Sequence, residues 1–252
     1  MARRRDPCAA GASRCDPCAP GAPRIGILMI NSPNIPRYAH MAAMINYAYA
    51  ARHGYGFMVA RCPDRRDAAQ SWAWSPADEF RLVWSKPRML AAALRVWDVV
   101  LFLDSDAAVW DFDVKIEDRV AELMPDPRVC VAMAQDCRTA SVCYKADELN
   151  AGVVLARRTP HVHRILAHWG DPERDCAKWA HAHPYEQACV NVLRKKHYGA
   201  FIRKVDVEKL NGADGRWIRH FMATSAEHRA RVMRRRLADV LACDLGAAAQ
   251  SA

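Results

Sequence analysis

The sequence predicts an α/β domain whose central, mostly parallel sheet carries helices on its faces, and three observations support this. First, an apolar run at Ile25–Ile30, a helical stretch at Tyr38–His53 and a second apolar run at Phe57–Ala60 follow one another. Such a strand–helix–strand unit favours parallel strands joined by a right-handed crossover. Second, Val99–Leu103 is apolar throughout, as in a central strand covered on both faces. Third, segments of both kinds alternate along the rest of the chain.

Residues that interrupt regular structure set the expected bounds of the first elements. The polar loop Asn31–Asn34 contains Pro and ends the first strand, and Gly54 ends the first helix. Ser followed closely by Pro marks a helix start, because the first turn of a helix tolerates Pro. This signal predicts helices from Ser75-Pro76 and from Ser85, the second leading into Arg88–Trp97.

The second half of the chain continues the alternation, with apolar residues at helical spacing in its helices. The expected strands are Val129–Ala134, Gly152–Ala156 and Trp217–Phe221. One expected helix starts at Thr159-Pro160, and two others span Pro184–Lys196 and Ser225–Leu241.

Length and composition describe one domain with a full-sized core: 252 residues, 52% hydrophobic and 26% charged. Lys plus Arg number 37 and Asp plus Glu 28, so the net charge of +9 favours an anionic partner. No run approaches the roughly 18 to 20 apolar residues of a membrane span. The charged start Met1–Arg5 lacks the apolar run of a signal peptide, which predicts a cytoplasmic protein. Its ten cysteines are then expected to be reduced and mostly buried thiols.

Composition also divides the chain into three parts. Residues 1–24 are rich in Gly, Ala, Pro and Arg and repeat Asp-Pro-Cys-Ala, which predicts a disordered basic arm. Residues 25–241 form the expected domain, and residues 242–252 are expected to form a flexible tail.

Two carboxylates directly follow the predicted central strand. Asp104 and Asp106 point to the same side of an extended chain, at the strand end where open α/β sheets bind ligands. Neighbouring carboxylates repel each other unless a cation joins them, and oxygen ligands suit Mg²⁺ or Mn²⁺. Such an ion typically bridges to substrate phosphates. The pattern alone leaves two alternatives open, a metal site and a pair of solvated loop acids.

The segment Val99–Ala107 resembles the DxD segment of retaining, GT-A fold nucleotide-sugar glycosyltransferases, of the galactosyl-, xylosyl-, mannosyltransferase and glycogenin-like groups. Four further segments resemble motifs of that family in the same order: Trp84-Ser85-Lys86, Leu149–Leu155, Glu186-Gln187, and Asn211 followed by Trp217–Phe221. The resemblance spans about residues 25–236 and implies a single Rossmann-like GT-A domain.

The resemblance implies a metal-dependent transfer of a hexose or pentose from a nucleoside diphosphate sugar, a UDP-sugar above all. The acceptor would be a hydroxyl group of a glycan or glycoconjugate, and the transfer would retain the anomeric configuration. It implies that Asp104, Asp106 and His220 hold Mn²⁺ or Mg²⁺, with the imidazole favouring Mn²⁺.

The same resemblance implies roles for further residues. Asn150, Gln187 and Glu186 form the implied catalytic group near the anomeric carbon of the donor sugar. The implied donor-binding residues are Asn31, Lys86, Asp104, Ser105, Asn150 and Asn211.

The chain departs from these relatives after His220. A Gly, and later a Lys, often follow that histidine, whereas this chain continues Phe-Met-Ala-Thr. His228 and Arg229 are the candidates to replace the Lys. Golgi relatives also carry an N-terminal membrane anchor, and none is expected here.

Two other functions stay open from the residues themselves. A phosphoryl-transfer enzyme with an Asp-x-Asp nucleophile pair would have the motif on its first strand and a Thr or Val at the position of Ala108. A nucleic-acid-binding module would use the +9 charge and the arginines of Ser225–Leu241. No recognised binding motif accompanies them, so no nucleic-acid partner is expected.

Overall fold

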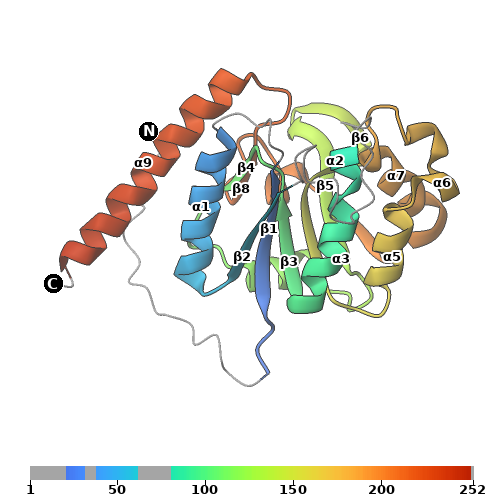
Figure 1. The fold of residues 1–252 in the computed structure, drawn as a ribbon, viewed down its shortest axis with the longest axis horizontal. Coiled ribbons are helices and arrows are strands. Elements are labelled where there is room, and N and C mark those ends of the chain that lie inside the picture. The colour runs from blue at the N-terminus through green and yellow to red at the C-terminus, as the bar shows by residue number, and fades with distance from the viewer. Residues whose placement is uncertain (1–20, 32–37, 62–80, 251–252) are drawn as a thin grey trace, which may run out of the picture.

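A computed structural model of the chain describes residues 21–31, 38–61 and 81–250 (Figure 1). Its main sheet is built from β1 (Ile25–Asn31), β2 (Gly56–Arg61), β3 (Val99–Leu103), β5 (Val131–Thr139), β6 (Val142–Arg157) and β7 (Ile202–Val205). The strand order is β2-β1-β3-β6-β5-β7. β1 is parallel to β2 and β3, and β5 is parallel to β7, whereas β6 is antiparallel to both its neighbours. The predicted mixed, mostly parallel sheet is confirmed.

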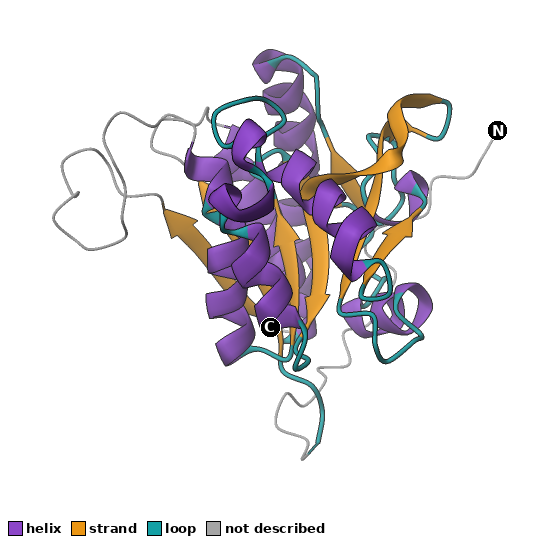
Figure 2. Cartoon of the chain, turned by 90° about the vertical axis from the view of Figure 1, so that its right-hand side faces the viewer, coloured by secondary structure: helices purple, strands orange, loops and turns teal. Residues whose placement is uncertain are grey.

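Helices cover both faces of this sheet (Figure 2). Five of the helices that line its two cores are α1 (Tyr38–His53), α3 (Lys86–Val96), α5 (Val162–Trp169), α7 (Glu186–Leu193) and α9 (Ala226–Gln250). Alternate residues of β3 enter different cores. Leu101 and Leu103 pack in the core that includes α1 and α9, while Val100 and Phe102 pack in the core that includes α3, α5 and α7. β3 is therefore buried on both faces, as its apolar sequence predicts.

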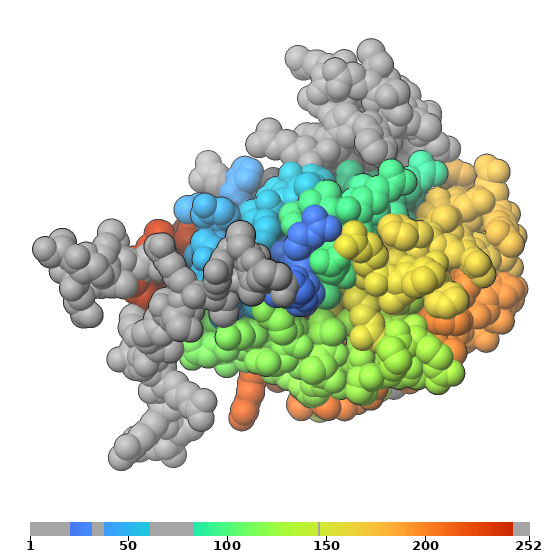
Figure 3. All heavy atoms as spheres, turned by 90° about the horizontal axis from the view of Figure 1, so that it is seen from below, coloured from blue at the N-terminus to red at the C-terminus, as the bar shows by residue number. Residues whose placement is uncertain are grey.

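Shorter elements connect these layers. They are α2 (Arg81–Trp84), α4 (Ile116–Leu123), α6 (Pro172–Asp175), a 3₁₀ turn (Ala177–Trp179), a π-helical turn (Arg194–Tyr198) and α8 (Val207–Leu210). A separate two-stranded sheet pairs β4 (Ala107–Val109) with β8 (Ile218–His220). Seen from below, the segments from α5 to α7, yellow to orange, form one end of the molecule (Figure 3).

Several elements extend beyond their predicted bounds, and β6 and α9 differ most. β6 begins at Val142 rather than Gly152, because it forms a hairpin with β5 whose bulges break the alternation that marks a strand. α9 continues to Gln250 rather than ending at Leu241, since the alanines of residues 242–249 favour helix. The helix predicted from Ser75-Pro76 and most of the predicted arm 1–24 lie outside the described residues. The division of the chain at residues 24 and 241 stays a prediction.

The expectation of reduced thiols is wrong for five of the cysteines that the structure describes, and Cys243 of α9 is one of them. Cys137 and Cys143 form a disulfide across the β5–β6 hairpin, and Cys176 and Cys189 form one that ties the segment after α6 to α7. Cys130 is a buried free thiol, as expected. Both pairs are created by hairpin register and helix packing, which cysteine spacing alone does not reveal.

Two glycines at the edge of the sheet let the Trp97 side chain pack against the strand backbone. Gly26 of β1 and Gly56 of β2 are register partners. A Cβ atom at either position would overlap the Trp97 indole, which follows the last residue of α3. The indole therefore packs directly on the backbone of two strands.

We expect Gly26→Ala to destabilise the domain by about 1–3 kcal/mol, because overpacking forces the indole or the strands apart. Denaturant unfolding measures this free energy. In a Trp97→Leu background the same substitution should cost clearly less. Equal costs in the two backgrounds would contradict the assignment of the strain to this contact.

Candidate active site

The two aspartates of the DxD segment lie at a turn between strands. Asp104–Asp106 connects β3 to β4, and the register of β4 with β8 sets Ala107 opposite His220. Asn46 of α1 holds β4, because its amide donates to the Ala107 carbonyl at 3.1 Å and accepts from the Val109 N–H at 2.8 Å. His220 therefore arrives beside the aspartates through this small second sheet.

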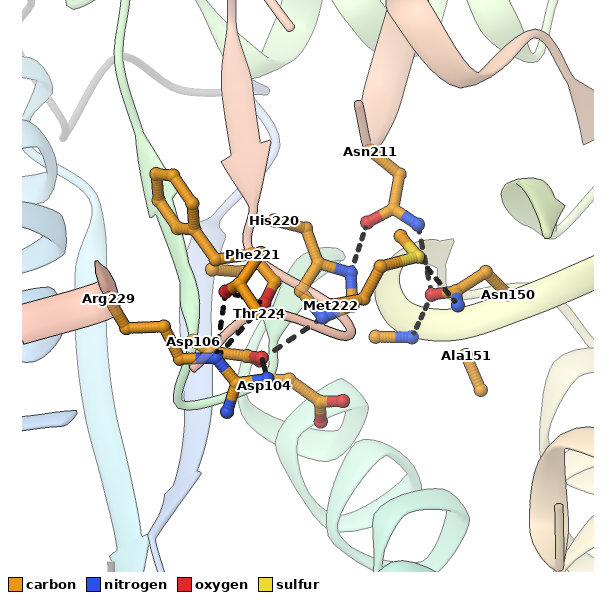
Figure 4. Close-up of polar contacts among 12 residues, drawn as sticks. Asp104, Asp106, Asn150, Ala151, Asn211, His220, Phe221, Met222, Thr224 and Arg229 are labelled. Atoms are coloured by element: carbon orange, nitrogen blue, oxygen red, sulfur yellow. Dashed lines mark hydrogen bonds and ion pairs between the residues drawn. The ribbon is translucent and has the colours of Figure 1, made fainter. Parts of the chain in front are cut away.

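Asp104, Asp106 and His220 form a cluster with one ligand atom each, and these atoms lie within 4.8 Å of one another (Figure 4). His220 Nε2 is 3.1 Å from Asp106 Oδ1. Burial by itself would raise the pKa of Asp106, but the charges of His220 and Arg229 outweigh burial and lower the pKa to about 2. Burial raises the pKa of the Asp104 carboxyl, and Lys86 offsets only part of that effect. Two carboxylates and an imidazole fit a divalent cation.

The backbone of β6 admits the imidazole because residue 152 is glycine. A Cβ atom at Gly152 would overlap the ring of His220. The Gly152 carbonyl also accepts a hydrogen bond from the Asp104 N–H at 2.7 Å. The glycine of the Asn-Ala-Gly segment therefore makes room for His220, and its carbonyl holds the backbone of Asp104.

A row of amide side chains runs from His220 away from the aspartates (Figure 4). His220 Nδ1 lies 2.8 Å from Asn211 Oδ1, and Asn211 Nδ2 donates to Asn150 Oδ1 at 2.9 Å. Asn150 Nδ2 then donates to Asp136 Oδ1 at 3.0 Å, and Gln187 Nε2 donates to Asp136 Oδ2 at 3.1 Å. Four of the residues singled out in the sequence thus share one network with an acid that was not singled out.

Lys86 forms a buried bridge between two acids. Its Nζ lies 2.9 Å from Asp104 Oδ1 and 2.9 Å from Glu186 Oε1. Lys86 is 7% exposed and Glu186 is 3% exposed. Burial by itself would lower the pKa of Lys86, but the two carboxylates outweigh burial and raise the pKa. The ammonium group therefore stays charged and neutralises the two acids.

Arg229, near the start of α9, brings a further cation to the cluster. Its Nη2 lies 3.1 Å from Asp106 Oδ2, and its Nη1 donates to the Tyr38 hydroxyl at 3.0 Å. Its Nε donates to the Phe221 carbonyl at 3.0 Å. His228, the other candidate to replace the missing Lys, contacts Arg231 at 3.2 Å instead. Arg229 is the one of the two that reaches the aspartates.

Two further residues named from the sequence lie at the same sheet edge. Ser105 is half-buried in the turn between the aspartates. Asn31 ends β1, whose parallel register with β3 pairs Met29 with Leu103. The Oδ1 atom of Asn31 is buried and has no hydrogen-bond partner among the described residues. The loop after Asn31 lies outside the described part of the chain.

Sequence reasoning missed Asn46 and Asp136. Asn46 is a fully buried polar residue on the buried face of α1, and a polar residue on an apolar helix face was the available signal. Asp136 gave a weaker signal, as an acid in a strand beyond the predicted end of β5 at Ala134.

Solved structures with this fold are glycosyltransferases. One that takes part in glycosylation of the major capsid of PBCV-1 has a TM-score of 0.63 and 19% identity, covering 84% of this chain and 100% of that one. The galactosyltransferase LgtC has a TM-score of 0.53 and 13% identity, covering 86% and 95%. GlyE of Streptococcus pneumoniae TIGR4 has a TM-score of 0.53 and 14% identity, covering 85% and 60%. The domain therefore has the GT-A fold of glycosyltransferases, as the DxD segment led us to expect.

The chain belongs to the galactosyl transferase GMA12/MNN10 family, which it matches over residues 27–227. It is thus an enzyme, a glycosyltransferase. No curated protein sequence matches the chain. Among the helices that the structure describes, none has the length and apolar character needed to cross a membrane.

We expect Gly152→Ala to weaken Mn²⁺ binding by about 10-fold or more, because the new methyl group displaces the His220 ring. Titration of Mn²⁺ followed by electron paramagnetic resonance measures the affinity. Gly199→Ala is the matched control, since an added Cβ there meets only the Arg194 carbonyl, at 3.3 Å. Unchanged affinity in Gly152→Ala would contradict the steric argument.

The backbone after β8 is strained at the exposed residue Ala223, whose φ is 53°. This left-handed region costs an L-residue about 1–2 kcal/mol, whereas glycine adopts it freely. We expect Ala223→Gly to stabilise the domain by up to about 1 kcal/mol, because glycine's greater freedom in the unfolded chain offsets part of the gain. Urea unfolding measures this change in the free energy of unfolding. As a control, Ala92→Gly on the exposed face of α3 should destabilise the domain instead. A destabilised Ala223→Gly would refute the strain.

Proposed function

We propose that this glycosyltransferase moves a sugar from a nucleoside diphosphate sugar, specifically a UDP-sugar, to a hydroxyl group of a glycan or glycoconjugate. The proposal includes retention of anomeric configuration and a requirement for Mn²⁺ or Mg²⁺. The observation that carries it is the convergence of Asp104, Asp106 and His220 at the end of β3. LgtC, which has a similar fold, is a galactosyltransferase solved with donor and acceptor sugar analogs.

Asp104, Asp106 and His220 would hold the cation, and the imidazole favours Mn²⁺ over Mg²⁺. When bound, the cation supplies positive charge that stabilises the departing diphosphate. Arg229 would supply a second, fixed positive charge to the same group, because a guanidinium suits phosphate oxygens. Its contacts with Tyr38 and Phe221 hold it in place for this role.

The donor would lie along the sheet edge that carries Asn31 and Ser105. The buried Oδ1 of Asn31 has no partner among the described residues and would accept a hydrogen bond from the base or ribose. A buried acceptor without a partner costs stability, so a donor group that satisfies it gains affinity. Lys86 contributes by pairing with Asp104 and Glu186 and holding both carboxylates in position.

Retention is supported by the state of the two acids beyond the metal cluster. An inverting enzyme needs a carboxylate free to take the acceptor proton. Glu186 is buried against Lys86, and Asp136 already accepts two amide hydrogen bonds. In the proposed step the bond from the anomeric carbon to the diphosphate breaks, and the acceptor oxygen bonds to the same face. The departing phosphate oxygen takes the acceptor proton.

We expect Asp106→Asn to lower sugar transfer by about 100-fold or more. The loss of an anionic ligand weakens binding of the cation that would stabilise the charge developing on the diphosphate. Release of nucleoside diphosphate from UDP-, GDP- and dTDP-sugars, with Mn²⁺ and a panel of glycan acceptors, measures turnover. Turnover should be highest with a UDP-sugar. Asp113→Asn is the control, because Asp113 is exposed and, within the described part of the chain, its carboxylate forms its ion pair with Arg52, at 2.6 Å. Full turnover in Asp106→Asn would contradict the assignment of Asp106 to the metal site.

A further inference from the structure

Asp136 stands at one end of the amide row that begins at His220. An ionised carboxylate can only accept hydrogen bonds. It accepts one from Asn150 at Oδ1 and one from Gln187 at Oδ2, at 3.0 Å and 3.1 Å. The amide NH₂ groups of both residues must therefore face Asp136, and their carbonyl oxygens must face away from it.

The fixed amides present their oxygens to backbone donors. Gln187 Oε1 accepts from the Ala151 N–H at 3.0 Å, and Asn150 Oδ1 accepts from the Gly152 N–H at 2.9 Å. Either amide, if turned over, would point its NH₂ group at a backbone N–H. Such donor-to-donor contact in a buried site costs about 1–3 kcal/mol.

The same direction passes on to His220. Because Asn150 offers an oxygen, Asn211 must offer its NH₂ group to it, at 2.9 Å. Asn211 then presents its own oxygen to His220, so Nδ1 of the imidazole carries a proton. Nε2, which lies 3.1 Å from Asp106, is thereby the nitrogen turned toward the metal cluster.

We propose that Asp136 is a positioning residue that sets the direction of every hydrogen bond in this row, from Gln187 to the Nδ1 proton of His220. It acts through other residues and holds the imidazole in the form that presents Nε2 to a cation. This inference rests on the proposed function only in assigning His220 to the metal.

The substitution Asp136→Asn tests the direction while keeping the shape. Asparagine has one acceptor and one NH₂ group. It can accept a hydrogen bond from one of the two amides, Asn150 or Gln187, but it points its own NH₂ group at the NH₂ group of the other. If Asn150 turns over to relieve the opposition, Asn211 must turn as well. Asn211 then points its NH₂ group at His220, and the proton leaves Nδ1.

The first readout is the hydrogen-bonded Nδ1 proton of His220, observed by ¹⁵N-imidazole NMR in the metal-free protein and assigned with His220→Gln. We expect this signal in the native chain and in Asp136→Glu, which keeps an acceptor-only carboxylate. We expect it to be lost or split in Asp136→Asn. The second readout is Mn²⁺ affinity, which should fall roughly tenfold in Asp136→Asn, at the low end for partners outside the ligand sphere.

Asp147→Asn is the matched control, since Asp147 lies in the same hairpin and pairs with surface lysines such as Lys204, at 3.1 Å. It should change neither readout. If Asp136→Asn does not fold, Asp136→Ala, which removes both acceptors, should show the same loss of the signal. An unchanged Nδ1 proton and Mn²⁺ affinity in the folded variant would overturn the proposal. Because the NMR readout needs no sugar, failure of sugar transfer in the native chain would count against the proposed function alone.

Discussion

The pairing of β4 with β8 is the constraint on which the candidate site depends. It joins the turn after the central strand to a strand near the C-terminal end, and it sets Ala107 opposite His220. Only three residues of each strand take part, so the pairing needs support from outside. Asn46 provides it from α1 by bonding β4 on both sides of Ala108, and Gly152 provides the space that the imidazole fills.

Charge balance is the second requirement of this arrangement. Three acids converge with little water around them, and an unpaired buried charge costs several kcal/mol. Lys86 is shared between Asp104 and Glu186, while Arg229 and His220 share Asp106. The acids are thus held in position before any ligand arrives. Each cation comes from a different helix or strand, so the balance exists only in the folded chain.

The direction of the hydrogen bonds beside the cluster is the third requirement of this arrangement. The row from His220 to Gln187 contains side-chain amides whose two ends differ only in hydrogen-bonding character. An isolated row of amides can run in either direction. Here the backbone N–H groups of Ala151 and Gly152 and an acceptor-only group at one end together supply the direction. Asp136 is that group, and it lies in the hairpin that the Cys137–Cys143 disulfide closes. The hairpin therefore contributes to the chemistry of the site as well as to the sheet.

The sequence by itself determined the features that depend on local patterns. The apolar run Val99–Leu103 fixed a central strand, its position before Asp104 fixed the edge where the site lies, and the five motifs in order fixed the enzyme class. Tertiary structure alone decided which groups face each other. The start of β6 at Val142, the disulfides, the sharing of Lys86 and the role of Asp136 all depend on how separate elements pair or pack. The reason is that periodicity and turn residues act over a few neighbours, whereas register, burial and hydrogen-bond direction are set only when distant segments pack together.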